Sequence, residues 1–269
     1  MPAPVCLSLG AVLAACVATS ALAAPPRIVS LDQCADQYVL ALEPRADIVG
    51  LSTRARNTDS YLAGQARGLP RRRATTESIL AARPTIAVRY WGGDPRLVAD
   101  LRRRGVKVVE IDDAIDFPGV RANVRKVAAA LDRHSTGEGL IAAMDARLAA
   151  SAGAWRGAGA LYLTSGGDTS AGGTLIDAMM RAAGLTNLAP GQGWRAVSLE
   201  RLVLSPPSAI VEGFFDVAAD AYWRWSIARQ GALRRVTAHR TLVALPGAIL
   251  GCPAWFAADG TSAIARAKG

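Results

Sequence analysis

Residues 76–94 read TESILAARPTIAVRYWGGD, and the pattern from Glu77 onward recurs from Glu200 as ERLVLSPPSAIV. In both copies an acidic residue precedes an apolar pair, a proline stands seven residues after the acid, and a short apolar run comes next. The proline ends a helix because it lacks an N–H donor, and an apolar run without alternation is typical of a parallel strand covered on both faces. We therefore expect each copy to form a short helix that leads into a buried strand.

The hydroxyl residues upstream of the two acids, Thr76 and Ser198, are the expected N-caps, since such side chains accept hydrogen bonds from free N–H groups of the first turn. Glu77 and Glu200 then lie where the helix dipole favours a negative charge. The two acids are 123 positions apart, far more than the period of a solenoid repeat. The pattern predicts two similar α/β lobes, although a helix, a proline and a strand also follow one another by chance.

The rest of the chain alternates in the same way. Strands are expected at residues 27–31, 48–51, 106–111 and 160–164, and helices at 32–42, 95–104 and 175–183. Two helices at 120–131 and 137–152 have no strand between them, which is typical of a connection between lobes. The glycine-rich residues 165–173 lack the spacing of a nucleotide-binding motif and are expected to form a loop. We divide the chain into a signal peptide (1–23), an N-terminal lobe (24–136), a connector helix (137–155) and a C-terminal lobe (156–269).

The first 24 residues contain no charged side chain, and Ala21-Leu22-Ala23 has the form of a signal-peptidase site. We therefore expect export to the periplasm as a soluble protein. A competing lipoprotein site, Leu13-Ala14-Ala15-Cys16, would anchor the chain through Cys16. Two cysteines remain after processing, Cys34 and Cys252. Export permits a disulfide between them, but the sequence leaves open whether they pair.

The net charge of +9 comes largely from runs of arginine. No nucleic-acid motif accompanies these runs, so we expect partners among anionic small molecules or membrane surfaces rather than nucleic acid. The chain has only two histidines, His134 and His239, and no G-x-S-x-G motif. These features favour a binding protein over an enzyme. An exported two-lobed enzyme remains the alternative outside transport.

Taken together, residues 27–31 (RIVSL), the 77–93 segment, LRRRGVKVV at 101–109 and WRAVSLE at 194–200 resemble the substrate-binding proteins of ABC importers for cobalamin, ferric siderophores and haem. The resemblance implies a class III periplasmic-binding fold: two Rossmann-like α/β lobes with mostly parallel sheets, joined by one long helix, with the ligand between them. It also implies a monomer that delivers its ligand to an ABC permease dimer in the inner membrane. In this family one surface glutamate from each lobe docks onto permease arginines, and the matching residues are Glu77 and Glu200.

Candidate ligand residues lie near the expected strand ends. Tyr90, Trp91 and Trp194 are similar to aromatic positions of the cobalamin-binding branch, and aromatic faces suit a large macrocycle. The candidate partners for carboxylates or phosphate of a chelate are Arg54, Arg56 and Arg89. We favour a corrinoid over a ferric siderophore by a narrow margin, and both over haem, because no Tyr or His set is arranged to ligate a bare metal.

Overall fold

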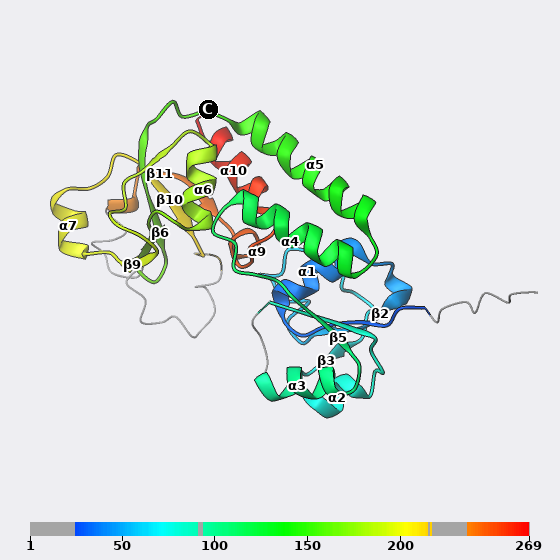
Figure 1. Ribbon diagram of the computed structural model, residues 1–269. Helices are drawn as coiled ribbons and strands as arrows, with labels where there is room; N and C mark the ends of the chain where they lie inside the picture. The colour runs from blue at the N-terminus through cyan, green and yellow to red at the C-terminus, as the bar shows by residue number, and fades with distance from the viewer. Residues whose placement is uncertain (1–24, 91–93, 215, 217–235, 269) are drawn as a thin grey trace, which may run out of the picture.

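The computed structural model describes residues 25–90, 94–214, 216 and 236–268. Its N-terminal part contains a five-stranded parallel sheet with the strand order β3-β2-β1-β4-β5. The strands are β1 (Ile28–Ser30), β2 (Ile48–Ser52), β3 (Arg71–Arg72), β4 (Ile86–Arg89) and β5 (Lys107–Glu110). Helices α2 (Thr76–Leu80) and α3 (Pro95–Arg103) lie at the end of this lobe that is farthest from the C-terminal lobe (Figure 1).

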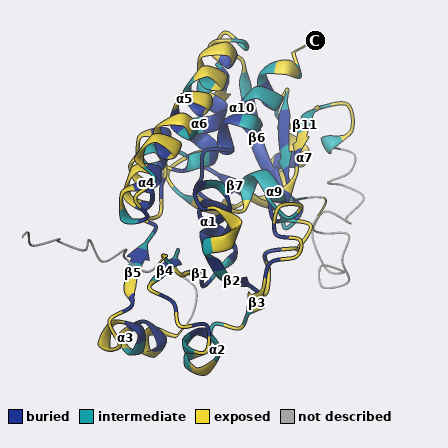
Figure 2. Cartoon of the chain, turned by 90° about the vertical axis from the view of Figure 1, so that its right-hand side faces the viewer, coloured by how far each residue is buried: buried dark blue, intermediate teal, exposed yellow. Residues whose placement is uncertain are grey.

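Both faces of this sheet are buried, as the uninterrupted apolar runs predicted. Ile28 and Val88 pack with α1 (Gln33–Leu42) and α4 (Phe117–Ala130), whereas Val29 and Ala87 pack with α2 and α3 on the opposite face. Successive strand residues point to opposite faces, so an apolar residue is needed at each position. Figure 2 shows the outer sides of α3, α4 and α5 exposed to solvent, while α1 is buried between the sheet and the other lobe.

The C-terminal part contains a four-stranded parallel sheet with the order β11-β10-β6-β8. Its strands are β6 (Gly159–Thr164), β8 (Thr186–Asn187), β10 (Ile210–Gly213) and β11 (Thr241–Leu245). The helices of this part are α6 (Leu175–Ala182), α7 (Leu199–Leu204), α9 (Gly247–Leu250) and α10 (Ala257–Arg266). The chain thus has the expected α/β class with parallel sheets. A short 3-10 helix, Arg45–Asp47, precedes β2 in the first lobe.

One expected loop is partly a strand. Residues 165–173 include β7 (Asp168–Ser170), which pairs antiparallel with β9 (Trp194–Ala196). Trp194, one of the candidate ligand residues, is the first residue of β9. Gly167 and Gly173 both have positive φ, so glycine serves here to turn the chain at the two ends of a short strand.

The long helix α5 (His134–Ser151) packs against α4 and α10 and runs along the outside of the molecule (Figure 1). The predicted connector, residues 137–155, overlaps α5, and the division into lobes stays a prediction. The predicted signal peptide lies outside the described residues. Within the part of the chain that the structure describes, no helix is long and apolar enough to cross a membrane.

The repeated pattern forms a short helix followed by a strand in both places: α2 and β4, then α7 and β10. Ser198 caps α7 as expected, because its Oγ accepts a hydrogen bond from Arg201 N at 3.2 Å. The cap of α2 is Thr75 rather than Thr76, and Thr75 Oγ1 accepts from Ser78 N at 3.3 Å. The Thr76 hydroxyl instead donates to an Asp100 carboxylate oxygen at 3.1 Å, which ties α2 to α3.

Candidate functional site: the cleft between the lobes

Two adjoining cavities, of about 490 and 350 Å³, share Tyr90, Leu250 and Gly251 in their walls. The N-terminal lobe contributes residues that follow β1, β2, β4 and β5, and the C-terminal lobe contributes the starts of β9 and α6 and the end of α9. Ligands of open α/β sheets bind at the carboxyl ends of the strands, and the volumes fall in the usual range for small-molecule sites. The two cavities together form a cleft between the lobes.

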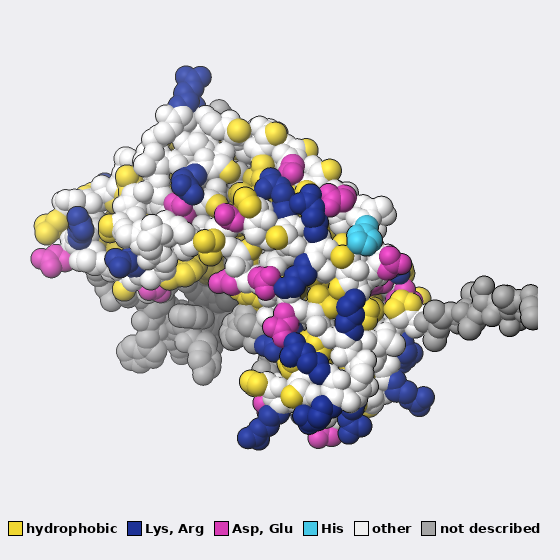
Figure 3. Space-filling view, viewed as in Figure 1, with side chains coloured by type: hydrophobic (Ala, Val, Ile, Leu, Met, Phe, Trp, Pro, Cys, Tyr) yellow, Lys and Arg dark blue, Asp and Glu magenta, His cyan; other side chains and the backbone are white. Residues whose placement is uncertain are grey.

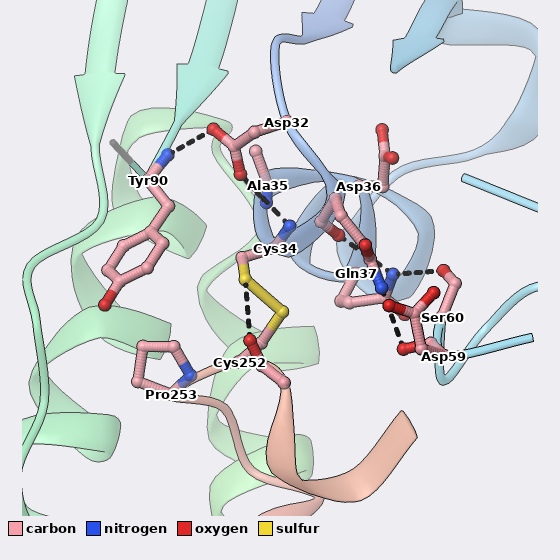
Figure 4. The surroundings of a disulfide bond; sticks show 12 residues. Asp32, Cys34, Ala35, Asp36, Gln37, Asp59, Ser60, Tyr90, Cys252 and Pro253 are labelled. Carbon is pink, nitrogen blue, oxygen red and sulfur yellow. Dashed lines mark hydrogen bonds between the residues drawn. A yellow bond between two sulfur atoms is a disulfide. The ribbon is translucent and has the colours of Figure 1, made fainter. Parts of the chain in front are cut away.

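Asp32, the residue that caps α1, also positions Tyr90. One carboxylate oxygen of Asp32 accepts hydrogen bonds from Cys34 N at 3.0 Å and Ala35 N at 2.9 Å, and the other accepts from Tyr90 N at 2.7 Å (Figure 4). The Tyr90 hydroxyl donates to Asp113 Oδ1 at 2.7 Å. Burial raises the pKa of the Tyr90 phenol, and the hydrogen bond to Asp113 raises it further. Tyr90 therefore faces the cleft as a neutral phenol.

A buried carboxylate lies beneath this wall of the cleft. Asp36 accepts hydrogen bonds from Ser52 N at 2.8 Å, from the Ser52 hydroxyl at 2.5 Å and from the Ser30 hydroxyl. Burial raises the pKa of Asp36 to about 6, although these hydrogen bonds act in the opposite direction. The network fixes the start of α1 against the ends of β1 and β2.

The disulfide Cys34–Cys252 joins the two lobes at the floor of the cleft, with an S–S distance of 2.11 Å (Figure 4). Cys34 lines the larger cavity and Cys252 the smaller one, and Cys34 Sγ lies 3.4 Å from the carbonyl oxygen of Gly251. Beside this link the Tyr38 hydroxyl donates to Pro253 O at 2.6 Å. The sequence left the pairing of these cysteines open, and the structure pairs them.

A second contact between the lobes lies around Tyr61. Its hydroxyl donates to Asp259 of α10, its ring stacks on Phe256 at 4.2 Å between centroids, and Arg147 of α5 pairs with the same Asp259 at 2.9 Å. Burial, with the hydrogen bond to Asp259, raises the pKa of Tyr61 to about 12. The lobes are therefore held together through side chains as well as through the chain itself.

Trp194 forms part of the C-terminal wall. Its side chain is a large exposed apolar group, at 54% exposure, and its ring packs edge-on against Tyr162 at 5.9 Å between centroids. The Tyr162 hydroxyl is buried and has no hydrogen-bond partner among the described residues. A Cβ placed on Gly213 would lie 2.1 Å from this hydroxyl and 2.7 Å from Leu250 Cδ1, so position 213 has no room for a side chain.

A third cavity, of about 600 Å³, lies elsewhere, between β9 and α7 within the C-terminal lobe. Trp194 also borders it, but the described residues of its walls come from one lobe only and include no carboxylate. We place the site in the cleft because the cleft combines residues of both lobes, hydrogen-bonded carboxylates and the ends of parallel strands.

The structure brings Tyr90, Trp194 and Arg54 together around the cleft. Arg54 lines the larger cavity and pairs with Asp59 at 2.9 Å. Arg56 lines neither cleft cavity, because its guanidinium donates to carbonyl oxygens within its own loop, those of Ala66 at 3.3 Å and Leu69 at 3.1 Å.

The remaining predicted residues are Trp91, Arg89, Glu77 and Glu200. Trp91 lies outside the described residues. Arg89 ends β4, and its Nε is buried without a partner in the described part of the chain. Glu77 and Glu200 are exposed near the starts of α2 and α7 and do not border the cleft cavities.

Sequence reasoning missed Asp32, Asp113 and Tyr162. Asp32 lies two residues after the end of β1 and Asp113 three residues after the end of β5. Their position after a strand is the signal that could have identified them. His134 and His239 are exposed and line neither cleft cavity. Among the described residues, no group of three His, Cys, Asp or Glu side chains is placed to hold a metal ion.

Solved structures with the same fold include periplasmic binding proteins of several kinds. A periplasmic haem-binding protein from Roseiflexus sp. RS-1 is 24% identical, with a TM-score of 0.70 over 91% of this chain and 100% of that one. A vitamin B12 binding protein of Vibrio cholerae is 18% identical, with a TM-score of 0.63 over 90% and 96%. An Fe3+-hydroxamate transport protein from Saccharomonospora viridis is 20% identical, with a TM-score of 0.66 over 91% and 93%.

No curated protein matches the sequence significantly. The sequence pattern of the family described as periplasmic binding protein matches residues 28–212, which is more than half of the chain. The match begins at β1 and ends within β10, so it includes the N-terminal sheet and the C-terminal sheet except for β11. The chain therefore belongs to the periplasmic binding protein family, as the resemblance in its sequence indicated.

Proposed function

We propose that this protein captures a metal chelate with a large macrocycle, a corrinoid such as cobalamin, in the cleft between its lobes and delivers it to an ABC permease. The observation that carries the proposal is the convergence of Tyr90, Trp194 and Arg54 on one cleft at the carboxyl ends of parallel strands. Solved proteins of this fold include carriers of haem, vitamin B12 and ferric hydroxamate, so a chelate is the class of ligand to test first.

Trp194, Leu250 and Arg54 have distinct parts in the proposed binding. The Trp194 ring offers a wide apolar face at a small cost in side-chain entropy. Leu250 lies in the wall shared by both cavities and adds an apolar floor. Arg54 is bound to Asp59 through a single Nη2 contact, which leaves its other donors for a carboxylate or phosphate group of the chelate.

Haem is the second candidate, because Tyr90 places a phenol in the cleft and tyrosine is a known axial ligand of haem iron. Ligation needs the phenolate, whereas burial and the bond to Asp113 both favour the neutral phenol. A chelate whose metal takes no ligand from the protein avoids this cost. We therefore rank a corrinoid or a ferric siderophore above haem.

The test is a titration of the purified protein with cyanocobalamin, haemin and a ferric hydroxamate, followed by absorbance and thermal unfolding. A bound chelate stabilises the fold by about 2.7 kcal/mol at a hundredfold excess over its Kd. The variant Tyr90→Phe separates the candidates, since it keeps the ring but removes the ligand atom. Corrinoid binding should be nearly unchanged in this variant, whereas an iron–phenolate absorption band should be lost. If none of the three ligands shifts the unfolding temperature, the proposed ligand class is wrong.

A substitution at Trp194 tests the position of the site. Trp194→Ala should weaken chelate binding by about 1–3 kcal/mol, the usual cost of removing an aromatic anchor. Leu204→Ala is the matched control, because Leu204 is 74% exposed on the same lobe and lines neither cleft cavity. Equal effects of the two variants would place the ligand outside the cleft.

Delivery to the permease is proposed through the exposed Glu77 and Glu200, one near the start of a short helix in each lobe. Carboxylates at helix starts form paired, charge-assisted hydrogen bonds with partner arginines. The protein is proposed to act in the periplasm as a monomer after removal of residues 1–23, with the two lobes and the connector divided as the sequence suggested.

A further inference from the structure

The positive charge of this chain is concentrated in one segment. Residues 67–107 contain eleven Lys and Arg side chains and three carboxylates, so eleven minus three gives a net charge of +8, compared with +9 for the whole chain. The segment runs from the turn before β3 to the first residue of β5 and includes both α2 and α3. In Figure 3, Lys and Arg side chains gather over the lower end of the molecule, where Figure 1 places these two helices.

Several of these arginines are free to meet a partner. Arg73, Arg83, Arg96 and Arg104 are exposed, and in the described part of the chain their guanidinium groups form no ion pair and no hydrogen bond. Arg102 and Arg103 of α3 are paired with Glu110 and Asp100, so those two carboxylates are already used.

The free arginines surround the α2–α3 pair rather than forming one linear run. Arg73 lies just before α2 and Arg83 just after it, while Arg96 and Arg104 lie at the two ends of α3. Arg96 and Arg104 are eight positions apart, which corresponds to about 12 Å along the helix axis. Charges spread in this way suit a broad anionic surface better than a single small anion, which one or two guanidinium groups would surround.

We propose that the α2–α3 end of the N-terminal lobe, with Arg73, Arg83, Arg96 and Arg104, is a surface that binds the anionic headgroups of a lipid bilayer. Each Lys or Arg near an anionic membrane adds about 1 kcal/mol of attraction, and salt screens this attraction within a Debye length. The proposal does not depend on which chelate occupies the cleft. It gives the N-terminal lobe a means of holding the protein at the membrane surface before it meets a permease.

The test is co-sedimentation of the purified protein with vesicles of phosphatidylcholine, with and without 30 mol% phosphatidylglycerol (about the anionic content that makes such attraction measurable). We expect binding only to the anionic vesicles and release as the salt concentration rises. The variant Arg73→Glu/Arg104→Glu changes the local charge by four and should lower the partition coefficient by a factor on the order of a hundred or more. The variant Arg156→Glu/Arg266→Glu is the matched control, since both residues are exposed in the C-terminal lobe and unpaired among the described residues.

Three results would overturn the proposal. One is equal binding to neutral and anionic vesicles, and another is an equal loss in the control variant, which would indicate net charge rather than this surface. The third is binding to duplex DNA without binding to anionic vesicles, which would assign the surface to nucleic acid. Thermal unfolding and chelate titration of both variants show whether a loss comes from misfolding. We expect both variants to fold, since the guanidinium groups form no ion pair and no hydrogen bond among the described residues.

Discussion

Opening the Cys34–Cys252 disulfide should lower the free energy of unfolding by about 5 kcal/mol. The bond closes a loop of 218 residues, and the chain-entropy relation for a loop of that length gives about 5 kcal/mol at 25 °C. The native lobes should stay in place without it, because Tyr38 still donates to Pro253 and Tyr61 to Asp259. The loss therefore comes mainly from the greater freedom of the unfolded chain.

The assay is urea unfolding of the oxidised protein, of the reduced protein and of the variant Cys34→Ser/Cys252→Ser, followed by circular dichroism. If the same proteins are unfolded by heating, a loss of about 5 kcal/mol should lower the melting temperature by roughly 10–20 °C for a chain of this size. The serine variant serves as its own control, since a reductant should not change its unfolding. A reduced protein that unfolds at the same urea concentration as the oxidised protein would refute the reasoning. It would mean that the unfolded chain is already restricted or that the link is not formed.

Two further predictions concern carboxylates. Burial raises the pKa of Asp36 from 3.8 to about 6, so between about pH 4 and 6 the folded chain keeps a proton that the unfolded chain releases. The free energy of unfolding of the wild type should therefore fall as the pH rises from about 4 to 6. Asp36→Asn should remove this fall, because asparagine does not titrate. The difference between wild type and variant should reach about 3 kcal/mol at most, and a pH-independent difference in urea unfolding would contradict it. Glu77→Lys/Glu200→Lys should abolish uptake in cells while leaving chelate affinity unchanged, with Glu138→Lys on the exposed face of α5 as the control. Normal uptake by the double variant would restrict these glutamates to a role at the helix starts.

The elements of the fold were predictable where the sequence carries a local signal. Asp32 before α1 and Pro95 at the start of α3 mark helix starts, and the apolar run at β4 marks a strand buried on both faces. The local sequence does not show which of two neighbouring hydroxyl residues caps a helix. Thr75 and Thr76 are both good caps, and the choice depends on the contact of Thr76 with Asp100, which is distant in sequence.

The candidate site was predictable only in part, because its contacts join distant segments. Tyr90 could be identified from its position after a strand. The link between Cys34 and Cys252 spans 218 residues, and no pattern in the sequence brings the two together. Arg54 and Arg56 look equivalent in the sequence, yet one reaches the cleft and the other is used by its own loop. Trp194 could not be assigned to a strand, because β9 has three exposed residues and pairs, within the described part of the chain, with the short β7 alone.

The start of α1 couples the geometry of the cleft to the contact between the lobes. Six side chains between positions 32 and 38 bind four other segments through hydrogen bonds or the disulfide: Asp32 binds Tyr90, Gln33 and Gln37 bind Asp59 and Ser60, Cys34 and Tyr38 bind Cys252 and Pro253, and Asp36 binds Ser52. Because α1 contacts these segments, it is buried on nearly every side. Its buried polar side chains are tolerated because each of them has a hydrogen-bond partner. A change in the angle between the lobes would therefore move Tyr90 and the ends of β1 and β2 together. Chelate capture and movement of the lobes should depend on the same few residues.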